Sequence, residues 1–239
     1  MKNYALVTGS ADRIGKSVAL HLASQGYSLL LHYNSSAEKA EKVKHEIETL
    51  GNGVKAELLQ FNFLADHDFD EIFAALKAKN IILDILVNCA SDFVPSDFKM
   101  VGSQLLEKEF NINFKNAYLL TKAFARVYES GNIINFIDTK VTKNSTVHLD
   151  YILSKKLLQE FTKISAVELA PNFRVNGIAP GLILPPEGKD EGYLWNLAKN
   201  IPLKKIGNLD EINKAVQFII VSEFFTGQTL FIDGGEHLI

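Results

Sequence analysis

Thr8-Gly9-Ser10-Ala11-Asp12-Arg13-Ile14-Gly15 is the stretch of sequence that decides the fold. It ends a short strand-like run, 3–8, and opens a segment, 14–25, whose apolar residues have helical spacing. The glycines let the backbone turn tightly and approach a ligand closely, while the first N–H groups of a helix attract anions. A strand, a glycine turn and a helix in this order are typical of a pyrophosphate site, although such a turn can also be purely structural.

The alternation of short strands and longer helices continues along the chain. Each further β-rich run is followed by a helical pattern, in the order 28–33 then 36–50, 54–60 then 67–79, 81–87 then about 102–129, and 131–137 then about 150–169. Two more strands are expected at 172–178 and 228–232. The run at 81–87 is apolar enough for a strand that is covered on both faces. We therefore predict one α/β domain with a doubly wound parallel sheet.

One stretch, 183–208, departs from this alternation. It contains Pro185, Pro186, Tyr193 and Trp195, and it lies where a loop can close over a site beyond the strand ends. A helical excursion that packs on the surface explains the same residues equally well.

Composition excludes several classes of function. A formal net charge of -3 and a pI near 6.1 give no basic surface for nucleic acid, and no apolar run approaches the roughly 20 residues that cross a bilayer. The first strand follows Met1 closely, without a signal peptide, so we expect a soluble cytoplasmic protein that acts on a small molecule. Cys89 is the only cysteine, which excludes an internal disulfide, and the six histidines lack metal-ligand spacing, so no metal is expected.

The end of the second predicted strand distinguishes between NAD and NADP. An acidic residue about 20 positions after the glycines would bind the free ribose 2′-hydroxyl of NAD. Here Asn34, Ser35 and Ser36 provide uncharged donors instead, and Arg13 in the glycine turn can reach a phosphate. The pattern favours NADP(H), and the alternative is a turn with a helix cap beside a solvated Arg13.

Three polar residues lie around the fifth predicted strand, 131–137, and the helix that follows it. Asp138 stands at the carboxyl end of the strand, where α/β sheets place their sites. Tyr151 and Lys155 are one helical turn apart and share a helix face. The phenol is a poor acid at neutral pH, but a nearby ammonium lowers its pKa and favours proton transfer. We therefore predict an acid–base site, although a Tyr-x-x-x-Lys pattern alone is common by chance.

Together, these motifs resemble those of the short-chain dehydrogenase/reductase family. The shared segments keep the family's order and spacing over nearly the whole chain: Thr8 to Gly15, Leu86-Val87-Asn88-Cys89-Ala90, Asn113, Tyr151 with Lys155, Arg174 to Gly181, and Asp233-Gly234-Gly235. The resemblance implies a single-domain Rossmann fold over 1–239 with a seven-stranded parallel sheet. It also implies a homotetramer or homodimer built on the helices near 102–129 and 150–169.

The resemblance also implies roles for individual residues. Lys155 would orient the cofactor ribose and tune Tyr151, and Asn113 would hold a water in the proton relay to Lys155. With the residues argued above, the remaining cofactor set comprises Gly9, Arg13, Ile14, Gly15, Asn34, Ser35, Ser36, Asn62, Asn88, Ala90, Pro180, Gly181 and Ile183. The substrate set comprises Arg13, Ser91, Phe93, Asp138 and Tyr151.

Two departures from the family pattern indicate one of its branches. Most members have serine at the position of Asp138 and glycine at that of Arg13. Arginine in the turn, an Asp-Tyr-Lys centre, His32-Tyr33 and the segment 86–93, which ends at Phe93, resemble the pteridine reductases. The segments 175–184 and 233–238 resemble bacterial dihydromonapterin reductases of that branch. Pro185 replaces the usual threonine of the Pro-Gly-x-Ile-x-Thr segment.

The charge of Asp138 separates the reactions that such a site can perform. An aspartate about 4 Å from a carbonyl oxygen that becomes negative opposes that charge by about 4 kcal/mol at an effective dielectric near 20, roughly a thousandfold in rate. A pterin ring instead offers N–H groups and takes up a proton on nitrogen, which suits an acceptor that shares a proton with Tyr151. The leading hypothesis is NADPH-dependent reduction of a pteridine, dihydropterin or dihydrofolate-like substrate. The alternatives are a ketone or 3-oxoacyl thioester reductase and a non-catalytic NADP-sensing protein.

Overall fold

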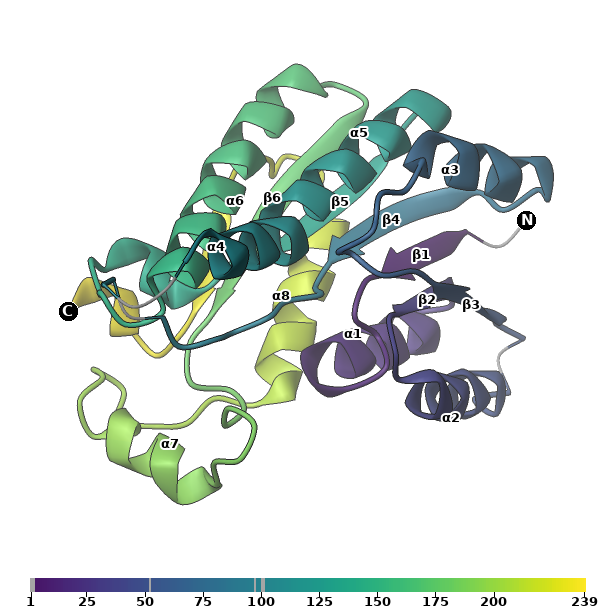
Figure 1. The fold of residues 1–239 in the computed structure, drawn as a ribbon. Coiled ribbons are helices and arrows are strands. Elements are labelled where there is room, and N and C mark those ends of the chain that lie inside the picture. Colours follow the sequence, from purple (N-terminus) through teal and green to yellow (C-terminus); the bar gives the residue numbers. More distant parts are fainter. Residues whose placement is uncertain (1–2, 52, 97, 100–101) are drawn as a thin grey trace.

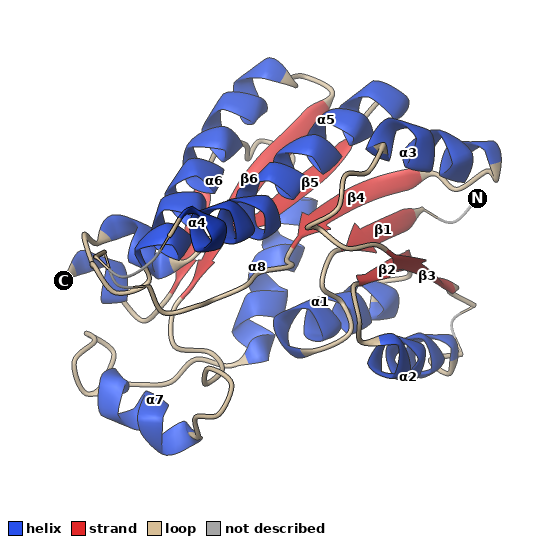
Figure 2. Ribbon diagram, in the orientation of Figure 1, coloured by secondary structure: helices blue, strands red, loops and turns tan. Residues whose placement is uncertain are grey.

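A parallel sheet forms the centre of the protein. The computed structural model describes residues 3–51, 53–96, 98–99 and 102–239. Within these residues the strands are β1 (Tyr4–Val7), β2 (Ser28–Tyr33), β3 (Ala56–Gln60), β4 (Leu83–Asn88), β5 (Gly131–Phe136), β6 (Phe173–Pro180) and β7 (Thr229–Ile232). Every neighbouring pair is parallel, and the order is β3-β2-β1-β4-β5-β6-β7 (Figures 1 and 2). The predicted doubly wound, seven-stranded Rossmann sheet is confirmed.

Helices cover both faces of the sheet. One face carries α1 (Arg13–Ser24), α2 (Ala37–Glu48) and α8 (Leu209–Val221), and the other carries α3 (Phe69–Ala78), α5 (Asn116–Val127) and α6 (Leu149–Glu168) (Figure 1). Successive side chains of β4 enter opposite cores, because Ile85 and Val87 pack under the first group of helices and Leu86 under the second. Burial on both faces explains why this strand is apolar almost throughout.

The helix expected at about 102–129 is interrupted. α4 (Ser103–Phe110) and α5 are joined by η1 (Asn111–Lys115), one turn of π-helix, in which the Asn116 N–H bonds to the Asn111 carbonyl oxygen. The extra residue in this turn changes the direction of the side chains that follow, and such turns are frequent at functional sites. Asn113 lies in the middle of the turn.

The helix α8 lies between β6 and β7, where no helix is predicted above. Its buried residues, Ile212, Ala215, Val216 and Ile219, have helical spacing. Its first turn is capped, because the Asn208 side chain accepts a hydrogen bond from the Glu211 N–H at 3.1 Å. Both signals are present in the sequence and would have identified the helix.

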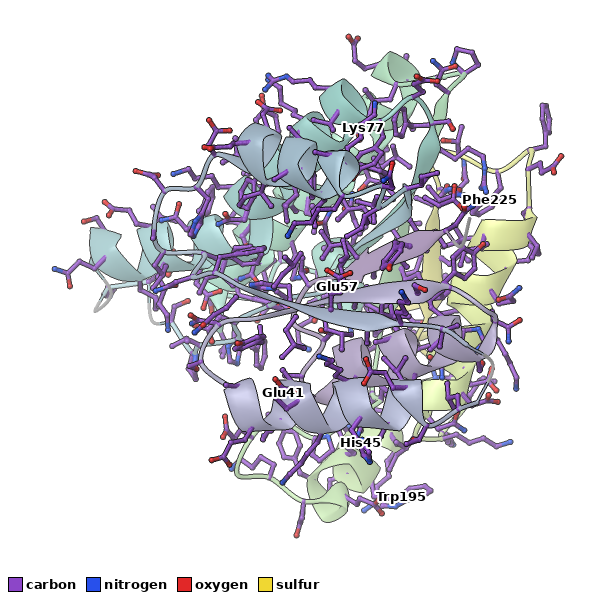
Figure 3. The ribbon with its side chains drawn as sticks, turned by 90° about the vertical axis from the view of Figure 1, so that its right-hand side faces the viewer. Glu41, His45, Glu57, Lys77, Trp195 and Phe225 are labelled. Atoms are coloured by element: carbon purple, nitrogen blue, oxygen red, sulfur yellow. The ribbon has the colours of Figure 1, made fainter. Side chains whose placement is uncertain are left out.

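The stretch 183–208 contains a short helix, α7 (Glu191–Ala198). It stands apart from the two helical layers in Figure 1, and Trp195 points outward from it with 52% of its surface exposed (Figure 3). The start of the stretch is anchored, because the Pro185 carbonyl oxygen accepts a hydrogen bond from Arg13 in the glycine turn. The helical excursion is therefore present, and it connects to the turn where the predicted site begins.

Candidate active site

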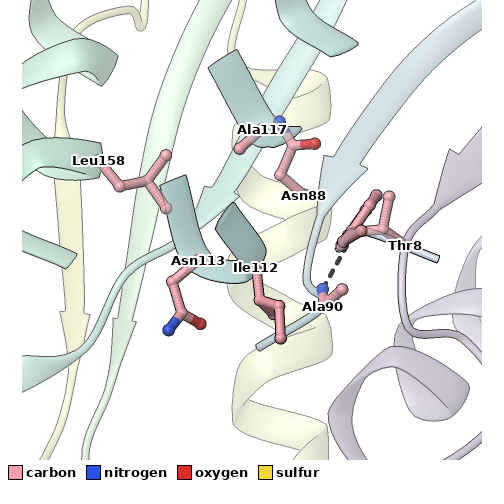
Figure 4. A pocket seen from close by; sticks show the side chains of 8 residues that line it. Thr8, Asn88, Ala90, Ile112, Asn113, Ala117 and Leu158 are labelled. Atoms are coloured by element: carbon pink, nitrogen blue, oxygen red, sulfur yellow. Dashed lines mark hydrogen bonds between the residues drawn. The ribbon is translucent and has the colours of Figure 1, made fainter. Parts of the chain in front are cut away.

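The glycine turn packs tightly against the end of β4. Gly9 has a φ of +66°, and a Cβ there would lie 2.9 Å from the Ala90 Cα, while a Cβ on Gly15 would lie 2.2 Å from the Gly9 carbonyl oxygen. The Thr8 hydroxyl oxygen accepts hydrogen bonds from the N–H groups of Cys89 (2.9 Å) and Ala90 (3.0 Å), and Figure 4 shows the bond from Ala90. Because neither glycine carries a side chain, the first N–H groups of α1 stay accessible to an anion.

His32, near the end of β2, supports this turn from inside the protein. Its buried ring stacks on Phe61 and Phe63, with centroid distances of 3.9 and 4.7 Å. Nδ1 accepts a hydrogen bond from the Gly9 N–H (3.1 Å), and Nε2 donates to the Phe61 carbonyl oxygen (3.1 Å). Burial lowers the pKa of His32 to about 4, so the ring is neutral and its partners fix the tautomer. The sequence alone does not reveal this supporting role of His32.

The polar residues 34–36 are exposed where β2 ends. Ser36 precedes α2 without capping it through a side-chain hydrogen bond. Arg13 has a φ of +54°, and its Nη2 donates to the Pro185 carbonyl oxygen at 2.8 Å. Lys39 in the first turn of α2 pairs with Asp12, which caps α1. The pair brings the first turn of α2 close to the glycine turn, so Lys39 adds a second positive charge near Arg13.

Two other residues of the predicted cofactor set have mainly structural contacts. Asn62 is exposed after β3, and its Oδ1 accepts a hydrogen bond from the Leu64 N–H at 2.9 Å, which forms a local turn. Ile14 packs against the core beneath α1. Their direct contact with a cofactor stays a prediction.

The carboxyl end of β6 packs against the end of β7. Pro180 is the last residue of β6, and a Cβ on Gly181 would lie 2.7 Å from the Asp233 Cα. Ile183 is buried in the core below this turn. Asp233 accepts a hydrogen bond from the Thr139 hydroxyl at 2.6 Å, which ties β7 to the short helix η2 (Thr139–Thr142). These contacts hold the ends of β5, β6 and β7 together on one side of the site.

Asn88 lies at the end of β4, and its side chain is buried. Nδ2 donates to the Asn135 Oδ1 at 2.8 Å, whereas Oδ1 has no hydrogen-bond partner among the described residues. A small cavity borders Asn88, Thr8 and Asn113, with about 10 Å³ of space for the centre of a water molecule (Figure 4). That space is roughly enough for one water molecule. The Asn88 side chain thus lies behind the surface of the site.

Tyr151 and Asp138 are in direct contact. The Tyr151 hydroxyl donates to the Asp138 Oδ2 at 2.7 Å, and the Lys140 N–H donates to the Oδ1 at 2.7 Å. Burial first, and then the charge of Asp138, raise the pKa of Tyr151 well above its ordinary value. The expectation of a lowered pKa is therefore wrong, because burial and the adjacent carboxylate raise it. Tyr151 holds its proton at neutral pH.

Lys155 is buried one turn further along α6. Its Nζ donates to the Phe136 carbonyl oxygen at 2.8 Å and lies 5.7 Å from the centre of the Tyr151 ring. Burial lowers the pKa of Lys155 to about 8. The predicted triad of Asp138, Tyr151 and Lys155 is thus assembled at the carboxyl end of β5.

Asn113 is held by the buried carboxyl group of Glu109, which is not one of the predicted site residues. Its Nδ2 donates to the Glu109 Oε2 at 2.5 Å, and its Oδ1 accepts from the Ser91 hydroxyl at 2.7 Å. Glu109 is fully buried in α4, and burial raises its pKa to about 7. The signal that could have found it is its spacing, because Glu109 and Asn113 are four residues apart and share one helix face. The π-helical turn, which the sequence does not reveal, completes the contact.

Phe93 lies beside Tyr151, but one of its faces is already covered. Its ring stacks on His148 at 3.9 Å with an interplanar angle of 14°, and it meets the Tyr151 ring edge-on at 4.8 Å. Lys140 Nζ lies 5.4 Å from the Phe93 ring centre. His148 has a φ of +61°, a conformation that places it at the start of α6 facing Phe93. The face of Phe93 that His148 covers is therefore closed to a flat ligand.

Three further findings concern the described residues. None of the helices in this part of the chain is long and apolar enough to cross a membrane. No three or more His, Cys, Asp or Glu side chains within the described ranges are grouped as metal ligands. Burial raises the pKa of Cys89 to about 12, so this thiol keeps its proton.

Known proteins resemble the chain over its full length. The model of the family described as Enoyl-(Acyl carrier protein) reductase matches residues 9–237. The chain is 29% identical to the 3-oxoacyl-(acyl-carrier-protein) reductase FabG of Staphylococcus epidermidis, over 100% of both chains. It is 27% identical to the Dihydromonapterin reductase of Klebsiella pneumoniae, over 98% of this chain and 96% of the relative.

A solved structure gives the same result. The crystal structure of FolM Alternative dihydrofolate reductase 1 from Brucella canis, complexed with NADP, superposes with a TM-score of 0.92. The two chains are 30% identical, over 99% of this chain and 94% of the other. These similarities, the sheet order and the assembled Tyr151–Lys155 centre agree, and the chain belongs to the short-chain dehydrogenase/reductase family.

Proposed function

We propose that this oxidoreductase uses NADPH to reduce a pteridine, dihydropterin or dihydrofolate-like substrate. The observation that carries the proposal is the 2.7 Å hydrogen bond from the Tyr151 hydroxyl to the Asp138 carboxylate. It pairs an acid that keeps its proton at neutral pH with a group that can exchange that proton. The similarity to a dihydromonapterin reductase and to an alternative dihydrofolate reductase supports the same class of substrate.

The residues around the glycine turn fit NADP(H). A pyrophosphate would lie against Gly9, Gly15 and the first N–H groups of α1, where no Cβ intervenes. Arg13, with residues 34–36, would hold the 2′-phosphate, because a phosphate is a stronger acceptor for a guanidinium than the Pro185 carbonyl oxygen that it now binds. Lys155 would bind the nicotinamide ribose. When bound, NADPH supplies the hydride.

The chain's own residues would manage the proton. The raised pKa of Tyr151 keeps the hydroxyl protonated until a substrate nitrogen becomes basic enough to take the proton. Asp138 is only partly buried, so it can collect a replacement proton from water and pass it across the existing hydrogen bond. Lys155 lies close enough to Tyr151 to stabilise the phenolate in between.

The substrate is tested with a panel of NADPH-oxidation assays on the purified protein. Dihydrobiopterin, dihydromonapterin, dihydrofolate and an acetoacetyl thioester are compared by kcat/KM. The proposal requires at least one of the first three to exceed the thioester. A preference for the thioester would establish the second candidate, a 3-oxoacyl thioester reductase, which the similarity to FabG supports. Cofactor binding without turnover of any substrate would indicate a sensing protein.

Cofactor preference gives the first prediction. NADPH is expected to bind at least about tenfold more tightly than NADH, and Arg13→Ala should remove most of that difference, because one charge-assisted phosphate contact contributes about 1.5–3 kcal/mol. Fluorescence titration of both cofactors measures the two affinities. Arg126→Ala, which removes a surface arginine paired with Asp70, is the matched control and should change neither. Equal affinity of the native protein for the two cofactors would refute the assignment.

Phe93 gives the second prediction. If the face of Phe93 away from His148 stacks on the pterin ring, Phe93→Ala should raise the KM for a dihydropterin by about tenfold, since an aromatic stack adds roughly 0.5–1.5 kcal/mol to the burial it provides. NADPH affinity should stay unchanged. His148→Ala removes the partner on the covered face of Phe93, so it should lower the melting temperature with much less effect on KM. A lower melting temperature with an unaltered KM in Phe93→Ala would show that Phe93 only packs the loop.

We further propose that the protein assembles with copies of itself through α6. Large apolar side chains are exposed along this helix: Leu153, Leu157, Ile164 and Val167, the last with 81% of its surface exposed. They repeat at a spacing that places them on one outer stripe of the helix. A second copy that presents the same stripe would bury it in a two-fold interface. The resemblance to the family extends this contact to a homodimer or homotetramer.

A further inference from the structure

Glu109 is a fully buried acid that the proposed mechanism does not use. Both of its oxygens accept hydrogen bonds, Oε1 from the Val94 N–H at 3.2 Å and Oε2 from the Asn113 Nδ2 at 2.5 Å. A buried charged group is costly unless it has such partners. A leucine at this position would pack in α4 without that cost, so packing alone does not explain the carboxylate.

The carboxylate fixes the orientation of the Asn113 amide. Asn113 Nδ2 donates to Glu109 and to the Asp92 carbonyl oxygen (3.1 Å), while Oδ1 accepts from the Ser91 hydroxyl (2.7 Å) and the Asp92 N–H (3.1 Å). A flipped amide would place oxygen against the Glu109 carboxylate and an NH₂ group against the Asp92 N–H. The contacts with Glu109 and with both Asp92 backbone groups would then be repulsive, and only the Ser91 hydroxyl could adapt, by accepting instead of donating. The observed orientation is therefore strongly favoured.

The fixed amide in turn fixes the proton of Ser91. Its hydroxyl donates to the Asn113 Oδ1 at 2.7 Å, a much shorter contact than the 3.5 Å to the Asp92 carbonyl oxygen, and an amide oxygen can only accept. Ser91 is exposed and lies close enough to the Tyr151 hydroxyl to lower the pKa of Tyr151, an effect smaller than those of burial and Asp138, which raise it. The Tyr151 proton is directed to Asp138. Ser91 and Asp138 therefore both present lone pairs beside the Tyr151 hydroxyl.

We propose that Glu109 is a positioning residue that sets the substrate specificity of this site. By holding Asn113 in one orientation, it makes Ser91 a hydrogen-bond acceptor, so the site favours a substrate edge that carries N–H groups over a carbonyl oxygen. The inference rests on the proposed function, because it explains how the site distinguishes a reduced pterin from a ketone. Glu109 touches neither substrate nor cofactor and acts only through Asn113 and Ser91.

The ionisation of Glu109 makes this positioning dependent on pH. Two N–H groups point at the two oxygens, and a protonated carboxyl group offers only one good acceptor. Burial raises the pKa of Glu109 to about 7; nearby Asp92 raises it further, and Lys108 opposes the shift. Across α6, Tyr151 and Lys155 are the titratable groups that interact with it. The ordered network should therefore form as the pH rises through about 7.

The stability of the folded protein should decrease over the pH range in which this network becomes ordered. Because the pKa of Glu109 in the folded protein lies above its unfolded value, ionisation costs stability, and this cost appears as pH rises from the unfolded pKa to about 7. Glu109→Gln removes the ionisable group. We expect the variant to gain melting temperature relative to the native protein at pH 8 and to lose that advantage at pH 5.

The test compares Glu109→Gln with the native protein and with Glu107→Gln, which removes an exposed carboxylate from the same helix. Glutamine keeps the size but offers one acceptor and one donor, so the two N–H groups can no longer both be accepted. We expect kcat/KM for a dihydropterin to fall at least about tenfold relative to that for an acetoacetyl thioester. Glu107→Gln should keep the native ratio.

A second variant exchanges donor and acceptor across the same contact. In Glu109→Gln with Asn113→Asp, the glutamine amide donates to the new carboxylate, whose other oxygen again accepts from Ser91. The Asp92 carbonyl oxygen loses its donor in this variant, so recovery is expected to be partial. We expect the ratio of dihydropterin to thioester activity to move back toward that of the native protein. If the role of Glu109 were merely structural, the double variant should lose more of the dihydropterin activity than Glu109→Gln alone.

The pH profile of the native protein provides a measurement that needs no variant. We expect kcat/KM for a dihydropterin to rise through about pH 7 with Glu109 and to fall above about pH 8 as Lys155 loses its proton. Glu109→Gln should lose the acid limb and keep the alkaline one. If Glu109→Gln kept both the native ratio of dihydropterin to thioester activity and the acid limb of the pH profile, the inference about Glu109 would be overturned and the proposed function would stand. If the native protein reduced no dihydropterin, the proposed function itself would be overturned.

Discussion

Replacing Tyr151 by phenylalanine is expected to lower kcat with a dihydropterin by a factor of about 10² to 10⁴, the usual range for loss of a general acid. The ring keeps its edge-on contact with Phe93, while the transferable proton and the hydrogen bond to Asp138 are lost. NADPH affinity should stay within about threefold, because the hydroxyl contributes mainly to the transition state. Single-turnover NADPH oxidation and fluorescence titration measure the two quantities.

The matched control is Tyr118→Phe on α5, which removes a hydroxyl that only accepts a hydrogen bond from Lys122 at the surface. It should leave both quantities unchanged. Native turnover in Tyr151→Phe, with a substrate that the native protein reduces, would show that another group donates the proton.

Asp138→Ser is expected to shift the preference between substrates by about a thousandfold toward the acetoacetyl thioester, the factor that corresponds to about 4 kcal/mol of removed charge repulsion. The serine hydroxyl would also donate to the oxygen that becomes negative. Removing the carboxylate should lower the pKa of Tyr151, because Asp138 is one of the causes that raise it. The ratio of kcat/KM values measures the preference, and absorbance near the phenolate band measures the pKa.

Asp138→Asn keeps the size of the side chain and removes its charge, while one of the two acceptor oxygens becomes an NH₂ donor, so the Tyr151 hydroxyl and the Lys140 N–H can no longer both be accepted. If charge repulsion by Asp138 causes the low activity with the thioester, Asp138→Asn should give most of the increase in kcat/KM for the thioester. An unchanged preference in both variants would mean that Asp138 does not face the reacting atoms.

The sheet was predictable because its signals are local. Apolar strands such as 81–87, the glycine turn and the alternation with helices each appear within a few residues. Tyr151 and Lys155 were predictable for the same reason, because their four-residue spacing on one helix already places both side chains on one face. The 2.7 Å contact of Tyr151 with Asp138 confirms that the two segments meet as expected.

The remaining parts of the site depend on contacts between distant segments. Glu109 looks like an ordinary surface residue in the sequence, and only the π-helical turn and the loop at 91–94 make it a buried partner of Asn113. The stack of His148 on Phe93 depends on a left-handed residue at the start of α6. The raised pKa of Tyr151 could not be predicted either, because the degree of burial is a property of the assembled fold.

The position of His32 has a consequence for redesigning cofactor preference. To change the cofactor to NAD, an acidic residue would be introduced at the end of β2, and the sequence offers positions 32 and 34 as equivalent choices. Replacing His32 would leave the Gly9 N–H and the Phe61 carbonyl oxygen without partners, each at about 1–3 kcal/mol, and would remove the ring stacked on Phe61. The Asn34 side chain is exposed, so its replacement would leave no buried hydrogen-bonding group without a partner. Directed evolution should therefore find variation tolerated at position 34 and eliminated at position 32, which links the evolvability of this enzyme to one buried imidazole.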